Sequence, residues 1–179
     1  MLLTLGLLGP SSAAAGELEP DQQALLLLRV LSYDRALEGR SLRLGIVYRR
    51  GDDAGQAYAR AVARSFRTLA ERSPLARGVR VFIVPMGDGN EYEAAMAEQN
   101  INVVYASRGL GSALRRLSEH CDDESLPLLT GTVGYIRAGA AVAVTEDAGR
   151  PRIVVHLSQS RAQGMRLHGS LLRLATVIR

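Results

Sequence analysis

The sequence feature that most limits the possible folds is a unit that occurs three times, a strand-like run followed by an amphipathic helix. The strand-like runs are rich in Val, Ile and Leu, and the helical runs carry apolar residues three and four positions apart. A fourth strand-like run follows the third unit. The strands are predicted at 42–50, 79–84, 101–106 and 126–129, and the helices at 58–69, 91–99 and 110–119. Such alternation predicts a parallel sheet with right-handed crossovers and helices on both faces.

The pattern changes in the last third of the chain. Two strand-like runs, 140–145 and 153–157, flank a polar turn that contains Gly149, which is typical of an antiparallel hairpin at the edge of the sheet. Residues 158–164 and 167–178 have helical patterns. The sequence therefore predicts a three-layer, doubly wound α/β fold whose mostly parallel sheet is extended by a C-terminal antiparallel hairpin and closed by a C-terminal helix. The length of 179 residues suits one core, so residues 16–179 are expected to form a single domain.

The first 15 residues have the order of a secretory signal peptide. An apolar run over residues 1–9 is followed by Pro10 and by the small residues Ala13, Ala14 and Ala15. The apolar run is less than half of the roughly 20 residues that a membrane span needs, so stable membrane insertion is not expected. We predict cleavage before Gly16 and a periplasmic location.

The predicted helix after Pro20 is apolar nearly all round. Its Leu-rich run must be covered on more than one side, either by the domain itself or by a second subunit. A homodimer interface on Leu27, Leu28 and Leu31 is the expectation that follows from the second possibility.

Composition argues against several functional classes. All 22 cationic residues are Arg, they are scattered along the chain, and aromatic residues make up only 4 %, so nucleic acid is not an expected partner. The single Cys121 excludes an intramolecular disulfide and a site of paired thiolates. We expect Cys121 to be a small structural side chain, because no base or orienting group is evident for a nucleophile.

No catalytic or metal-binding motif is found. The three histidines, His120, His156 and His168, lack metal-site spacing, no serine lies in a GxSxG turn, and a chain without Lys cannot form a Walker A loop. The run 87–90 resembles only half of a calcium loop. The sequence therefore predicts no enzyme activity, no metal and no cofactor, and structural roles for the histidines.

Ligands of doubly wound sheets bind beyond the carboxyl ends of the strands, where four loops are expected, at 49–53, 86–90, 106–111 and 130–134. In the third loop, Ser107, Arg108 and Gly109 precede a helix, whose free N–H groups and dipole favour an anion. In the fourth loop, Thr130, Gly131 and Thr132 offer two hydroxyls and a flexible backbone. Ordinary turn geometry explains both loops as well, and these six residues are the candidate ligand-binding set.

The C-terminal third resembles the YfiR-like family of periplasmic proteins. Residues 150–157 read Arg-Pro-Arg-Ile-Val-Val-His-Leu, and after an Ala-Gly turn region residues 170–175 read Ser-Leu-Leu-Arg-Leu-Ala. The entry helix, the strand at 42–50 and the Gly131 region occur in matching order. The chain departs from the family pattern at Tyr33-Asp34, where an aromatic-Pro pair is common, and in lacking the disulfide-forming cysteines of the best-known members.

The resemblance implies a secreted, non-enzymatic and often dimeric α/β domain. In the best-known system such a domain binds the periplasmic part of an inner-membrane diguanylate cyclase and holds it inactive until an outer-membrane lipoprotein sequesters the domain. We therefore expect a periplasmic regulator or adaptor that acts on a membrane receptor through protein contact. A single-lobe small-molecule sensor that uses the strand-end cleft is the alternative; an exposed apolar patch favours the first hypothesis and a polar pocket the second.

Overall fold

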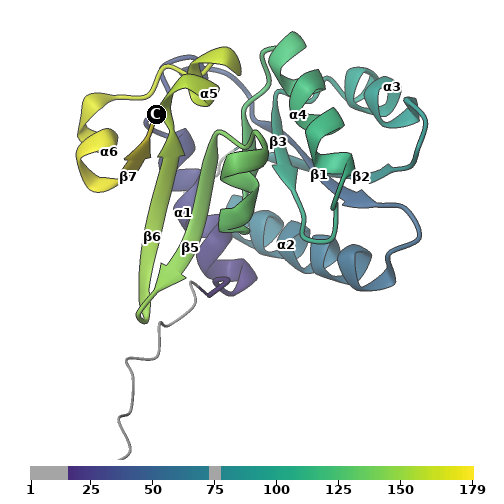
Figure 1. Cartoon of the computed structure of the whole chain (residues 1–179), viewed down its shortest axis with the longest axis horizontal. Coiled ribbons are helices and arrows are strands. Elements are labelled where there is room, and N and C mark those ends of the chain that lie inside the picture. Colours follow the sequence, from purple (N-terminus) through teal and green to yellow (C-terminus); the bar gives the residue numbers. More distant parts are fainter. Residues whose placement is uncertain (1–15, 73–77) are drawn as a thin grey trace, which may run out of the picture.

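The computed structural model describes residues 16–72 and 78–179, so the predicted signal peptide lies outside the described residues. The chain folds into one seven-stranded sheet with helices on both sides (Figure 1). The helices are α1 (Pro20–Leu31), α2 (Asp53–Arg72), α3 (Glu91–Glu98), α4 (Ala113–Asp123), α5 (Leu157–Ala162), α6 (Gly169–Leu174) and the 3-10 helix η2 (Val133–Ala138). The strands are β1 (Arg43–Arg49), β2 (Arg80–Met86), β3 (Val103–Ala106), β4 (Leu128–Thr130), β5 (Val142–Asp147), β6 (Arg150–His156) and β7 (Thr176–Ile178).

The strand order β2-β1-β3-β4-β5-β6-β7 confirms the doubly wound α/β prediction. The first five strands in this order are parallel, and β6 pairs with β5 in the antiparallel sense. The chain moves from β1 to β2 on one side and then returns to place β3 on the other side of β1. The order therefore reverses between β1 and β3, the place where doubly wound folds bind ligands.

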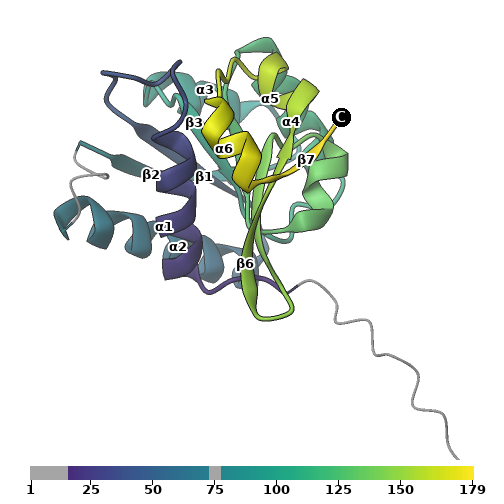
Figure 2. The ribbon, with the colours of Figure 1, turned by 90° about the vertical axis from the view of Figure 1, so that its left-hand side faces the viewer.

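Each face of the sheet has its own apolar core, because the side chains of successive strand residues point to opposite faces of the sheet. One core joins α1, α2 and α6 to strand residues such as Ile46 and Tyr105, and the other joins α3 and α4 to residues such as Val47 and Val104. In Figure 2, α1 and α6 lie on the side of the sheet that faces the viewer. The result is the predicted three-layer arrangement.

Helix α1 is covered within its own protomer. Leu27, Leu28 and Leu31 are all buried and belong to the core that α2 and α6 share. The apolar run is thus explained by the first of the two possibilities that the sequence left open, and these leucines present no apolar face to a second subunit. Leu25 is the large apolar side chain of α1 that is exposed, at 49 %.

The C-terminal hairpin forms as predicted, with Ala148 and Gly149 both at positive φ in the turn between β5 and β6. The helix predicted over 167–178 is shorter than expected and covers only α6. The backbone becomes extended at Ala175, and Thr176-Val177-Ile178 pairs with β6 as strand β7. Three consecutive β-branched residues have restricted side-chain rotamers in a helix and fit a pleated strand, which explains the correction.

Candidate functional site

The loops that follow β1 and β3 pack against each other at the switch point. Asp52 caps α2, because its Oδ1 accepts a hydrogen bond of 2.9 Å from the Gly55 backbone N–H. Gly109 has a φ of +85°, and a Cβ atom there would overlap Asp52 Oδ2. The glycine of the predicted ligand loop is therefore required by backbone conformation and by the close approach of the two loops.

Two predicted ligand hydroxyls are buried and serve the fold. Ser107 is buried against the carbonyl of Gly55, 3.5 Å away, and Thr130 Oγ1 donates to the carbonyl of Ala106 at 3.1 Å while accepting the N–H of Thr132 at 3.0 Å. A Cβ atom on Gly131 would overlap the side-chain amide of Gln23. Ser107, Thr130 and Gly131 thus hold the two loops in place.

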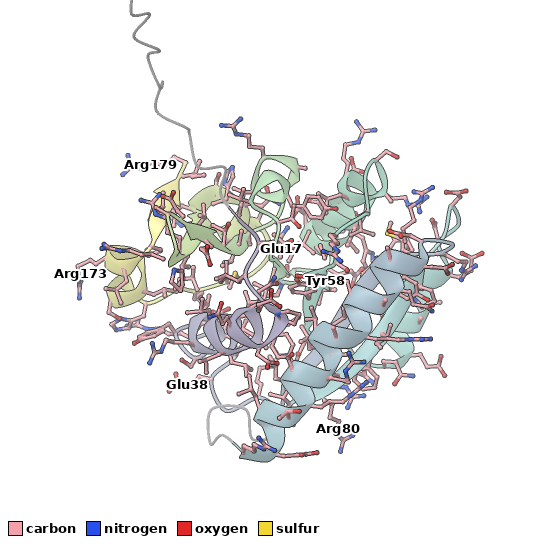
Figure 3. All side chains as sticks on the ribbon, turned by 90° about the horizontal axis from the view of Figure 1, so that it is seen from below. Glu17, Glu38, Tyr58, Arg80, Arg173 and Arg179 are labelled. Carbon is pink, nitrogen blue, oxygen red and sulfur yellow. The ribbon has the colours of Figure 1, made fainter. Side chains whose placement is uncertain are left out.

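Arg108 and Thr132, the other two predicted polar residues, meet at one carboxylate, that of Glu17. Glu17 Oε2 lies 3.5 Å from Arg108 Nη1, and its Oε1 accepts from Thr132 Oγ1 at 3.5 Å and from the Tyr58 hydroxyl at 3.0 Å. The Arg108 guanidinium stacks over the Tyr58 ring at 4.2 Å. Figure 3 shows Glu17 beside Tyr58, next to helix α2. The carboxylate that Arg108 contacts in this structure thus belongs to the chain itself.

A buried hydrogen-bonded chain leads from the centre of the sheet to Glu17. Gln23 Nε2 donates to the carbonyl of Leu18 at 2.6 Å and to the Tyr58 hydroxyl at 2.5 Å. Because a carbonyl only accepts, this contact fixes the amide orientation and turns Oε1 toward the Tyr105 hydroxyl, which donates to it at 2.6 Å. The donors therefore run in one direction, from Tyr105 through Gln23 and Tyr58 to Glu17.

Both tyrosines stay protonated in this environment. Burial raises the pKa of Tyr58 to about 12, and the nearby Glu17 carboxylate adds to this effect. Burial also raises the pKa of Tyr105 well above its ordinary value, with the neighbouring Tyr58 contributing in the same direction. The Tyr58 hydroxyl is consequently a donor to a carboxylate throughout the physiological pH range.

Sequence reasoning did not identify this network as a unit. Glu17 and Gln23 precede and begin the apolar helix, and their spacing carries no known motif. Tyr58 fits the apolar stripe of its helix, and Tyr105 lies in a buried strand. Their hydroxyls and side-chain amide meet only because β3 is inserted beside β1 and α1 crosses the same face.

The loop after β2 forms a second polar group. Arg49 pairs with Asp88 at 3.2 Å, and Arg116 donates to the Asp88 carbonyl at 2.5 Å, next to an open cavity of about 310 Å³. Burial raises the pKa of Tyr92 to about 12, and its ring lies 5.5 Å from the Arg116 guanidinium. Across the described residues, no group of three or more His, Cys, Asp or Glu side chains is arranged to hold a metal ion.

The histidines and the cysteine have structural surroundings. His156 and His168 cap α5 and α6, with Nδ1 accepting the N–H of Gln159 at 3.4 Å and of Ser170 at 3.2 Å. His120 packs edge-on against Tyr92. Burial raises the pKa of the Cys121 thiol, so that it remains un-ionised. These observations agree with the structural roles predicted for the four residues.

Exposed apolar side chains occur together at the C-terminal end of the fold. Leu174 is 75 % exposed, and Val177 and Ile178 of β7 are also exposed. Strand β7 is last in the sheet order, so its outer backbone edge has no strand beside it among the described residues. An exposed strand edge of this kind is able to pair with another chain. We refer to Leu174, Val177 and Ile178 as the β7 edge.

Comparison with solved structures supports the α/β fold of the chain. The chain matches the ABC domain in complex with L-Trp from Streptococcus pneumoniae with a TM-score of 0.65 at 13 % identity, covering 89 % of this chain and 62 % of that one. It matches the open, ligand-free substrate-binding protein CD0873 from Clostridium difficile with a TM-score of 0.63 at 13 % identity, covering 90 % and 60 %. A conserved domain protein from Vibrio cholerae matches with a TM-score of 0.61 at 17 % identity, covering 91 % and 61 %. The chain thus spans about three fifths of the length of these proteins.

A family model shows which family the chain belongs to. The model of the YfiR/HmsC-like family matches residues 33–176, and the chain belongs to this family. The family is one of periplasmic regulatory proteins. No curated protein matches the sequence. None of the described helices combines the length and the apolar character that crossing a membrane requires.

Proposed function

We propose that this protein is a periplasmic regulator that controls a membrane-bound diguanylate cyclase by direct contact with the receptor's periplasmic part. The observation that carries the proposal is the family match over residues 33–176. The proposal extends to export through a cleaved signal peptide, to homodimerisation and to an outer-membrane lipoprotein as a second partner. Regulation of this type requires only that the protein bind one state of the receptor more tightly than the other.

The β7 edge is the surface on which we place the receptor contact. It combines an open strand edge with apolar side chains, and Leu174 is the most exposed of the large apolar residues that the structure describes there. An added strand of the receptor would gain main-chain hydrogen bonds along β7, while the apolar side chains would be removed from water. The buried Leu27, Leu28 and Leu31 are unsuitable for any such contact.

Binding measured with purified components tests this proposal. The periplasmic domain of the membrane-bound diguanylate cyclase encoded nearest to this protein's gene is titrated by calorimetry with the mature chain. We expect saturable binding that Leu174→Asp weakens at least tenfold. Leu25→Asp, which changes an exposed leucine on α1, is the matched control and retains binding. Equal binding by both variants would contradict the assignment of the receptor contact to the β7 edge. The absence of binding by the wild type would contradict the proposal that this receptor is the partner.

A second candidate function is a single-lobe sensor of a small molecule. Two of the matched structures are described as a substrate-binding protein and as a complex with L-Trp, and the specific observation in this chain is the carboxylate held at the β1/β3 switch point. A sensor of this kind is compatible with the receptor contact, because the two surfaces lie on different elements.

A further inference from the structure

Glu17 lies at the switch point in the strand order, the region in which doubly wound folds bind their ligands. The segment Gly16–Glu19 lies along the carboxyl edge of the sheet, with Gly16 paired to Glu146 at the end of β5 through two backbone hydrogen bonds of 2.9 Å. Leu18 is buried, and Glu17 reaches back over the switch point to Tyr58 and Arg108. The side chain of Glu17 is still 29 % exposed, so solvent reaches the site that it fills.

The three residues around the Glu17 carboxylate come from separate elements, and each has a contact that does not involve Glu17. Tyr58 belongs to α2 and receives the hydrogen bond of the buried Gln23. Arg108 follows β3 in a loop that packs against Asp52, and its guanidinium stacks on the Tyr58 ring. Thr132 follows β4, and its N–H is fixed by Thr130. A preorganised set of donors of this kind keeps its geometry when the carboxylate is exchanged.

Glu17 satisfies this set incompletely. Two of its three contacts, to Arg108 and Thr132, are 3.5 Å long. Charge-assisted hydrogen bonds from a guanidinium to a carboxylate are typically about 2.7–2.9 Å. The backbone on both sides of Glu17 is fixed, Gly16 by its pairing with Glu146 and Leu18 by burial, whereas a free carboxylate has no such attachment.

We propose that Tyr58, Arg108 and Thr132 form a binding site for the carboxylate of a small organic acid, and that Glu17 is a built-in competitor which the ligand displaces. The protonated Tyr58 hydroxyl and the Arg108 guanidinium supply the two strongest donors, and Thr132 completes the site. The inference rests on the second candidate function and names its ligand class. It does not depend on the receptor contact at the β7 edge.

Chemical rescue of a vacated site tests the inference. In Glu17→Ala, 100 mM sodium acetate replaces the missing carboxylate, and we expect it to raise the melting temperature by about 2–4 °C over 100 mM sodium chloride. In the wild type the site is filled, and acetate is expected to change the melting temperature by less than about 1 °C relative to chloride. Glu19→Ala removes an exposed glutamate two residues away and serves as the matched control, with no acetate effect.

The double variant Glu17→Ala/Arg108→Ala assigns any rescue to this site. It is expected to lose the acetate effect, because the guanidinium is the main partner of the acetate. Equal stabilisation of the single and double variants by acetate would overturn the inference, as would a Glu17→Ala protein that responds alike to acetate and chloride. Glu17→Ser, which retains a small polar side chain, is used in the same way if Glu17→Ala fails to fold.

Titration with succinate then measures the competition directly. We expect a dissociation constant at least tenfold lower for Glu17→Ala than for the wild type, since the wild type must first release its own carboxylate. Equal constants would contradict the role of Glu17 as a competitor. These measurements use the purified chain alone, so their failure is distinguishable from a failure of the receptor-binding proposal.

Discussion

Replacement of Gln23 by Leu removes the central member of the buried network at nearly constant volume. The side chain of Gln23 is fully buried and joins the Leu18 carbonyl, the Tyr58 hydroxyl and the Tyr105 hydroxyl. Tyr58 keeps Glu17 as a partner, whereas the other two groups lose the hydrogen bond that Gln23 provides. A buried polar group without a partner costs about 1–3 kcal/mol, and the added apolar burial offsets part of this.

We therefore expect Gln23→Leu to lower the free energy of unfolding by about 3 kcal/mol. For a domain of this length, about 1 kcal/mol corresponds to a shift of roughly 2–4 °C in melting temperature, so the expected decrease is about 6–12 °C. Urea denaturation followed by circular dichroism measures the free energy, and differential scanning calorimetry measures the melting temperature. The adjacent Gln22 is exposed in the same helix, and Gln22→Leu is expected to change stability by less than about 0.5 kcal/mol.

A double-mutant cycle with Tyr105→Phe tests whether Gln23 and Tyr105 stabilise the fold through the same hydrogen bond. In the wild type, Tyr105→Phe removes a hydrogen bond and is expected to cost about 1 kcal/mol. In the Gln23→Leu background the hydrogen bond to Gln23 is already gone, so Tyr105→Phe is expected to cost clearly less than in the wild type. Equal stability of Gln23→Leu and Gln22→Leu, or a destabilisation by Tyr105→Phe of the same size in both backgrounds, would refute the account of the network.

Three further predictions concern the cap, the tyrosines and the leader. Asp52→Ala should lower the free energy of unfolding by about 1 kcal/mol through loss of the α2 cap, as measured by urea denaturation. Asp53→Ala is the control, and its smaller effect would identify Asp52 as the capping residue. The pKa of Tyr58 is raised from 10 to about 12, so its contribution to stability is present below pH 10 and is lost as the pH rises from 10 through 12. Tyr58→Phe should reduce the fall in unfolding free energy over that range, and an unchanged fall would contradict the assignment. N-terminal sequencing of the protein purified from the periplasm should show Gly16 as its first residue. Recovery of the protein from the cytoplasm with residues 1–15 retained would contradict export.

The order of elements could be read from the sequence because hydrophobic periodicity is local. The strand-helix repeats and the Gly149 turn gave the parallel sheet and the hairpin, as the observed strand order confirms. The helix prediction failed at residues 176–178. These residues continue an apolar stripe at helical spacing, but they are also three consecutive β-branched residues. Pairing with β6, which lies some 20 residues earlier in the chain, decided the outcome in favour of a strand.

The candidate site could be predicted only in part. The loop of Arg108 predicted an anionic ligand at the start of a helix, and in the structure Arg108 pairs with the carboxylate of Glu17 of the same chain. The identity of that carboxylate depends on how residues 16–19 cross the sheet, which no local pattern encodes. Likewise, Asp34 stands where a proline is common in the family, and its Oδ1 accepts the N–H groups of Ala36 at 3.0 Å and Arg166 at 2.8 Å. It thereby ties the end of α1 to the C-terminal segment, a contact across 132 residues of sequence.

The cellular amount of cyclic di-GMP, the product of diguanylate cyclases, tests the regulatory role most directly. It is measured in the parent strain, in a strain that lacks the gene, and in that strain supplied with the wild type, Leu174→Asp or Leu25→Asp. The account predicts that deletion changes the amount of cyclic di-GMP, that the wild type and Leu25→Asp restore the parental amount, and that Leu174→Asp does not. An amount that is the same in the parent and the deletion strain would contradict the account.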